Sequence, residues 1–172
     1  MTSRTESAAV MVHNKSLIIL GGYESGSGRL NSTEIITEDG QVSQGPDMPT
    51  KLSSHAVAGL NSTTSIITGG CTTVNCASPL TWYFNHISLQ FQPGPSLIMG
   101  RWRHASGTIV DQDTNENIVA VVGGDGAFQS TELLISGKWK QGKQSSKIIH
   151  CVYVFLFRLC IFSKMKILFL KS

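Results

Sequence analysis

Three apolar runs rich in β-branched residues each end in a glycine pair, and they recur at a spacing of about fifty residues. The runs are Leu17–Leu20 before Gly21 and Gly22, Ser65–Thr68 before Gly69 and Gly70, and Val119–Val122 before Gly123 and Gly124. A repeat of this length is typical of a supersecondary unit that buries its core by stacking on neighbouring units. The pattern therefore predicts a repeat architecture.

Within each unit, apolar positions alternate with polar turns and show no helical period, which indicates four short strands. The first two strands are predicted at Ala8–Val12 and Leu17–Leu20, at Ala56–Leu60 and Ser65–Thr68, and at Thr108–Val110 and Ile118–Val122. The third strands are predicted at Thr33–Thr37, Thr81–Asn85 and Thr131–Ile135, and the fourth near Gln41–Ser43, Leu89–Gln92 and Lys138–Lys140. Four strands in each repeat are typical of an all-β propeller blade.

The glycine pairs stand where a strand ends, and a Cβ there would obstruct close backbone approach or a positive φ. We therefore interpret all six glycines as structural positions of the repeat. The segments after them, Tyr23–Asn31, Cys71–Leu80 and Asp125–Ser130, differ most between units and are predicted to be surface loops.

The segment Arg101-Trp102-Arg103-His104-Ala105, followed by a hairpin and Gly123-Gly124, resembles the opening of a kelch repeat. The resemblance extends over 4–143 and implies an incomplete propeller with blades at roughly 7–48, 55–95 and 104–143. A complete propeller of this kind is a closed ring of more than three blades. We therefore interpret the chain first as part of a longer propeller. Self-association that completes the ring and a truncated, non-functional product are the alternatives.

Kelch propellers mostly bind other proteins, so the resemblance implies a non-catalytic interaction module with a protein partner. The residues expected to form its binding surface are Tyr23, Arg29, Trp102, Arg103, Asp125 and Phe128. His55 and His104 occupy the same repeat position, which favours a structural role for both. Arg101, like Arg4, is expected to bridge strands of its own unit.

The alternative function is that of a galactose-oxidase-like or epimerase-like enzyme. It is disfavoured because Tyr23, Tyr83 and Tyr153 fall at unrelated repeat positions, and because the chain has no phosphate-binding or dinucleotide-binding motif. Cys71 and Cys76 are expected to be free thiols, with a disulfide as the second choice and a zinc site as the least favoured. No cofactor and no metal ion are predicted.

The net charge of +3 comes from the end of the chain, because all 11 Asp and Glu residues precede residue 144. The repeat region is close to neutral, which disfavours nucleic acid as a partner. The hydrophobic, basic segment 144–172 is interpreted first as translated read-through, with membrane association through 148–170 or a divergent fourth blade as alternatives. The predicted location is the cytoplasm if Met1 is the true start, with a membrane as the runner-up.

Overall fold

The computed structural model describes residues 2–12 and 15–142, which form three four-stranded antiparallel sheets. Sheet 1 consists of β1 (Ala8–Met11), β2 (Leu17–Glu24), β3 (Gly28–Ile36) and β4 (Val42–Gln44). Sheet 2 consists of β5 (Ala56–Gly59), β6 (Thr64–Thr68), β7 (Thr81–Asn85) and β8 (Gln90–Pro93). Sheet 3 consists of β9 (Ala105–Val110), β10 (Asn117–Val122), β11 (Thr131–Ile135) and β12 (Lys138–Gln141). The prediction of an all-β chain with four strands in each unit is confirmed.

Strand order in every sheet follows the sequence, because short polar turns connect neighbouring antiparallel strands. The β5–β6 turn shows the local reason, since the Asn61 carboxamide oxygen accepts a hydrogen bond of 2.9 Å from the Thr63 backbone N–H. This bond adds to the backbone hydrogen bonds of the turn, in which the Leu60 and Asn61 N–H groups donate to the Thr64 carbonyl at 2.8 Å and 3.1 Å. The same residue type that marked the turn in the sequence therefore holds it in the structure.

Unit 1 differs from the prediction, because β2 does not end at its glycine pair. Its register shifts between Leu20 and Gly22, as in a β-bulge, and pairing with β3 then resumes as far as Glu24 and Gly28. The predicted loop Tyr23–Asn31 is therefore wrong: these residues form the arms and the tip of a hairpin. A bulge lets a strand bend and continue, which a count of apolar residues cannot detect.

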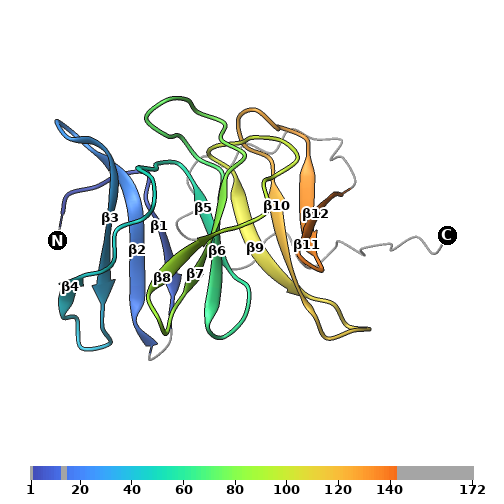
Figure 1. Ribbon diagram of the computed structural model, residues 1–172, viewed down its shortest axis with the longest axis horizontal. Coiled ribbons are helices and arrows are strands. Elements are labelled where there is room, and N and C mark those ends of the chain that lie inside the picture. The colour runs from blue at the N-terminus through green and yellow to red at the C-terminus, as the bar shows by residue number, and fades with distance from the viewer. Residues whose placement is uncertain (1, 13–14, 143–172) are drawn as a thin grey trace.

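The three sheets stand side by side, with sheet 2 between the other two (Figure 1). Their first strands are neighbours, since β1 lies against β5 and β5 lies against β9. The fourth strands β4, β8 and β12 lie on the opposite edge of each sheet. Residues far apart in the sequence but equivalent in the repeat therefore lie next to one another in space.

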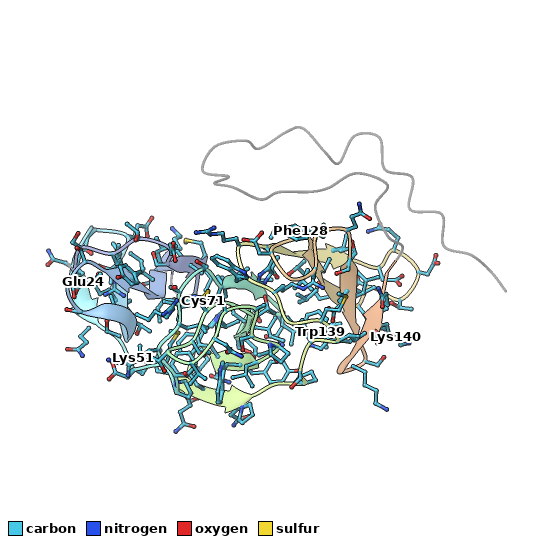
Figure 2. The ribbon with its side chains drawn as sticks, turned by 90° about the horizontal axis from the view of Figure 1, so that it is seen from above. Glu24, Lys51, Cys71, Phe128, Trp139 and Lys140 are labelled. Carbon is cyan, nitrogen blue, oxygen red and sulfur yellow. A yellow bond between two sulfur atoms is a disulfide. The ribbon has the colours of Figure 1, made fainter. Side chains whose placement is uncertain are left out.

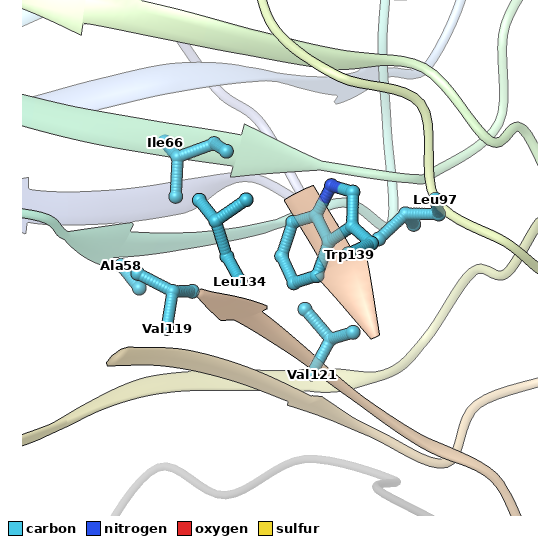
Figure 3. Packing of buried hydrophobic residues seen from close by; sticks show 7 residues of the cluster. All are labelled: Ala58, Ile66, Leu97, Val119, Val121, Leu134 and Trp139. Carbon is cyan, nitrogen blue, oxygen red and sulfur yellow. The ribbon is translucent and has the colours of Figure 1, made fainter. Parts of the chain in front are cut away.

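Two buried apolar clusters hold the sheets together, and sheet 2 contributes to both because its side chains alternate between its two faces. Ile67 and Phe84 pack with Ile18 and Leu20 of sheet 1, which we call the sheet 1–2 core. On the other face Ile66 packs with sheet 3 (Figure 3). This sheet 2–3 core contains Ala58, Ile66, Leu97, Val119, Val121, Leu134 and Trp139.

One position on the fourth strand of each sheet is held by Trp139, Phe91 and Val42. It takes part in this packing in two of the three sheets. Trp139 is buried and its Nε1 donates a hydrogen bond of 2.8 Å to the Pro95 carbonyl. Phe91 packs against the sheet 1–2 core, with its ring 4.6 Å from that of Phe84. Val42, at the same position of sheet 1, is 44% exposed. The outer face of sheet 1 is therefore less covered at this position than the corresponding faces of sheets 2 and 3.

The segment 144–172, including the stretch 148–170 considered as a membrane anchor, lies outside the described residues. Within residues 2–12 and 15–142, no helix has the length and apolar character needed to cross a membrane. The interpretations of this segment therefore stay predictions.

Candidate functional site at the loop end

The β2–β3 hairpin and the β6–β7 and β10–β11 connections lie at the same end of the molecule, which we call the loop end (Figure 1). The segments that lead into β1, β5 and β9 reach the same end, because isolated bridges pair Thr5 with Tyr23, Ser53 with Cys71, and Trp102 with Asp125. Figure 2 looks down on this end and shows Glu24, Cys71 and Phe128 spread across the three sheets.

Arg103 is the charged centre of the loop end. Its guanidinium lies 3.8 Å from a Glu6 carboxylate oxygen and 3.7 Å from an Asp125 carboxylate oxygen. Its Cζ lies 4.1 Å from the centroid of the Trp102 ring, a cation–π arrangement. Since half of the Arg103 side chain is exposed, these ion pairs contribute only about 0–1 kcal/mol to folding. The exposed guanidinium is therefore available for contact with a partner, and the partly buried indole supports it from below.

The backbone beneath this cluster links the three units. Glu6, Ser54 and Arg103 have φ values of 55°, 54° and 53°, in the left-handed region. The Ser54 N–H donates to the Glu6 carbonyl at 2.8 Å, and the Arg103 N–H donates to the Ser54 carbonyl at 2.9 Å. Sequence reasoning missed Glu6 and Ser54. Their equivalence to Arg103 in the repeat was the signal that could have found them.

Arg101 lies deeper and bridges strands of its own sheet. Its Nη1 donates to the carbonyl oxygen of Gly123 at 2.9 Å, and its Nη2 lies 2.6 Å from a Glu132 carboxylate oxygen. Both side chains are fully buried, with 0% and 1% of their surface exposed. Arg4 repeats the arrangement in sheet 1, with contacts to the Gly21 carbonyl and to Glu34. These arginines hold the glycine segments in place.

Sheet 2 replaces this ion pair with apolar residues. Glu132 also accepts hydrogen bonds from the Ile98 and Met99 backbone N–H groups, at 2.7 Å and 3.0 Å. The positions of Arg101, Glu132 and Ile98 are occupied in unit 2 by Leu52, Trp82 and Pro49. Proline has no N–H to satisfy, so the loss of the carboxylate leaves no donor unpaired at that position. The three changes are physically consistent with one another.

The two repeat-equivalent histidines are buried near the glycine pairs. His104 Nε2 forms a 2.8 Å hydrogen bond with the Thr68 hydroxyl, which connects unit 3 to the neighbouring β6. Burial lowers the pKa of His55 to about 4, and the Leu20 carbonyl opposes this shift only in part. Burial also lowers the pKa of His104 to about 3, with smaller contributions from the positive charge of Arg101 and from His55. Both rings are neutral in the folded protein at neutral pH.

These pKa values predict acid sensitivity. The unfolded histidines take up protons near pH 6.5 and the folded ones only near about 4 and 3. The free energy of unfolding is therefore unaffected by the two histidines above about pH 6.5. Below that pH it falls, by up to about 1.4 kcal/mol per pH unit for each histidine. Urea unfolding between about pH 6.5 and 5, above the usual range of carboxylates, measures the slope. His104→Gln should flatten it, and a variant as steep as the parent would contradict the assignment.

Cys71 and Cys76 form a disulfide in the β6–β7 connection, so the expectation of free thiols is wrong and the second choice was correct. Arg29 Nη2 lies 3.7 Å from the Cys76 sulfur, which ties the β2–β3 hairpin of sheet 1 to this loop. Sequence spacing allowed the bond, and the loop turns back on itself because the Thr72 N–H donates a hydrogen bond of 2.8 Å to the Asn75 carbonyl. Within the described part of the chain, no three His, Cys, Asp or Glu side chains gather as a metal site.

The predicted binding residues fall into two groups. Trp102, Arg103 and Asp125 are in direct contact, as described above. Phe128, which is 43% exposed, lies in the same β10–β11 connection as Asp125. Tyr23 and Arg29 belong to the β2–β3 hairpin instead, where Tyr23 is 42% exposed and pairs through its backbone with Thr5. All six lie at or near the loop end.

The fold defines the chain as three consecutive four-stranded antiparallel sheets joined face to face. No family model matches the sequence, and a search of curated proteins finds no match either. The likeness to kelch repeats therefore rests on the residues quoted above.

Proposed function

We propose that this chain is a non-catalytic protein-binding module of the kelch-propeller type, which contacts its partner through the loop end. The observation that carries the proposal is the stack of the exposed Arg103 on the partly buried Trp102, flanked by Glu6 and Asp125 from different units. Arginine and tryptophan are the residue types most enriched among the energetically dominant residues of protein interfaces. A propeller, of which these sheets would be three blades, presents such loops on a rigid scaffold.

The arrangement of charge also favours a protein partner. Arg103 lies between two carboxylates, so the cluster is mixed in sign and does not form the basic stripe that nucleic acid requires. Phe128 and Tyr23 add exposed aromatic surface on either side. Two kinds of side chain that enzymes often use already have partners here, because both cysteines of the loop form a disulfide and His104 is hydrogen-bonded to Thr68.

Crosslinking from defined positions tests the proposal. A photoreactive phenylalanine analogue is placed at Phe128, at the loop end, or at Ile87, in the turn between β7 and β8 at the opposite end; the two residues are 43% and 60% exposed. We expect one specific protein adduct from position 128 in an extract of the source cells and none from position 87.

Arg103→Ala provides the affinity measurement once that adduct has identified the partner. We expect the dissociation constant to rise by at least about tenfold, as for the removal of an interface arginine. Lys15→Ala, which removes an exposed lysine near the opposite end, should leave it unchanged. Adducts of equal yield from positions 87 and 128, or unaltered binding by Arg103→Ala, would exclude the loop end as the binding surface.

A further inference from the structure

Sheet 1 has an open apolar face on the side turned away from sheet 2. Val10, Ile18, Leu20 and Ile35 pack toward sheet 2, so the residues that alternate with them point the other way. The apolar outward residues are Ala9, Met11, Leu17, Ile19, Ile36 and Val42, and the polar residues Glu34 and Gln44 lie on the same face. Ile19 and Glu34 are buried, and Glu34 is paired with Arg4. Met11 is 58% exposed and Val42 is 44% exposed. Exposed apolar side chains grouped on one face of a sheet favour an interaction site there.

The same repeat positions are buried in the other two sheets. Ile19 corresponds to Ile67 and Val121, which are 1% and 0% exposed. Ile36 corresponds to Phe84 and Leu134, both of which belong to buried cores. In sheets 2 and 3 this set of residues receives the preceding sheet. The outer face of sheet 1 is therefore built to receive a sheet of the same type.

Sheet 3 carries the complementary surface on its own outer face. In sheet 2, the residues that pack onto sheet 3 are Ala58, Leu60, Ile66 and Tyr83. Their repeat equivalents in sheet 3 are Gly107, Ile109, Ala120 and Leu133, and they are half-buried or exposed. All four are uncharged, like their counterparts in the interface between sheets 2 and 3, whereas Lys138 and Lys140 of β12 lie on the same face at its edge. The outer faces of sheet 1 and sheet 3 thus correspond to the two surfaces that meet in each existing contact between sheets.

We infer that the outer face of sheet 1 docks onto the outer face of sheet 3 of a second copy of this chain. A groove of about 270 Å³ at the edge of this face is lined by Val42 and otherwise by polar residues, including Arg4 and Glu34, so the apolar contact is expected beside the groove and not within it. The contact is heterologous, so it closes into a ring or continues into a longer assembly. It leaves the loop end uncovered and does not depend on the proposed function.

Analytical ultracentrifugation of the full chain tests this docking. We expect the parent to form species larger than the monomer as concentration rises. Val42→Glu, on sheet 1, and Leu133→Glu, on sheet 3, should each weaken this association by at least about tenfold, because each places a charge in an apolar contact. The matched control is Val74→Glu, the same substitution at a residue of the β6–β7 loop that is 90% exposed. It should associate like the parent.

Mixing the two variants separates loss of contact from loss of folding. Val42→Glu keeps an intact sheet 3 face and Leu133→Glu keeps an intact sheet 1 face, so their mixture should form a one-to-one dimer and nothing larger. Circular dichroism checks that each variant is folded, and Ile109→Glu replaces Leu133→Glu if the latter is not. A parent that stays monomeric, a Val42→Glu variant that associates like the parent, or a mixture that stays monomeric would each overturn the inference.

Discussion

Replacement of Arg101 by leucine is expected to lower the free energy of unfolding by about 3–5 kcal/mol, because it leaves a fully buried carboxylate without its counter-ion. Glu132 is only 1% exposed and has its shortest contact, 2.6 Å, with the Arg101 guanidinium. The Gly123 and Ser130 carbonyl groups lose a donor as well. Urea unfolding, analysed by midpoint and slope, measures the effect.

The double variant Arg101→Leu with Glu132→Leu should be more stable than Arg101→Leu alone, since no charge then stays buried. The double variant should regain only part of the stability that Arg101→Leu loses, because the Ile98 and Met99 N–H groups lose the carboxylate that accepts their hydrogen bonds. Unit 2 avoids part of this cost by having Pro49 at the position of Ile98. The comparison tests whether apolar residues, such as Leu52 and Trp82 in unit 2, can take the place of the ion pair.

An exposed ion pair is the matched control for this experiment. Lys15 and Glu38 lie 3.2 Å apart, with 75% and 69% of their side chains exposed. Lys15→Leu should change stability by no more than about 1 kcal/mol, because water screens the pair. If Arg101→Leu cost as little as Lys15→Leu, or if the double variant were no more stable than Arg101→Leu, the role given to the buried pair would be wrong.

Gly70→Ala is expected to destabilise the chain nearly as strongly. Gly70 has a φ of 99°, a conformation that costs an alanine about 1–2 kcal/mol. An added Cβ would also lie 2.8 Å from the Ser53 carbonyl oxygen and 2.8 Å from the His55 Cβ. Displacing this packed backbone adds about 1–3 kcal/mol. Thermal or urea unfolding should therefore show a total loss of roughly 2–5 kcal/mol.

Gly137→Ala separates the two causes. Gly137 also has a positive φ, 74°, but nothing lies within 4 Å of a Cβ added there. Its substitution should show the backbone cost alone, about 1–2 kcal/mol. Equal losses for Gly70→Ala and Gly137→Ala would mean that close approach between segments does not explain the glycine pair.

Local pattern was sufficient for the strands, because a strand needs only alternating side chains and a turn at each end. The predicted β7, Thr81–Asn85, and β11, Thr131–Ile135, agree with the observed strands. The pattern failed at Gly21, where a bulge lets β2 continue into a longer hairpin. Whether a strand stops or bends at a glycine depends on its partner strand, which lies elsewhere in the chain.

The loop-end residues were predicted singly, without knowledge of their contacts. Trp102 and Arg103 were singled out because no other unit has tryptophan or arginine at these repeat positions, and the structure shows one stacked on the other. Glu6 escaped notice, because its contact with Arg103 joins the first unit to the third. The disulfide was similarly undecided, since a pair of cysteines at that spacing is compatible with several chemical states.

The sequence by itself determined that the chain is a repeat of four-strand units, because hydrophobic alternation, turn residues and glycine pairs act over a few residues each. Only the tertiary structure decided which units meet through which faces, and which charges meet at the loop end. Those contacts depend on side chains from different units, such as Thr68 with His104. A repeat pattern encodes the unit, whereas packing between units selects the partners of each side chain.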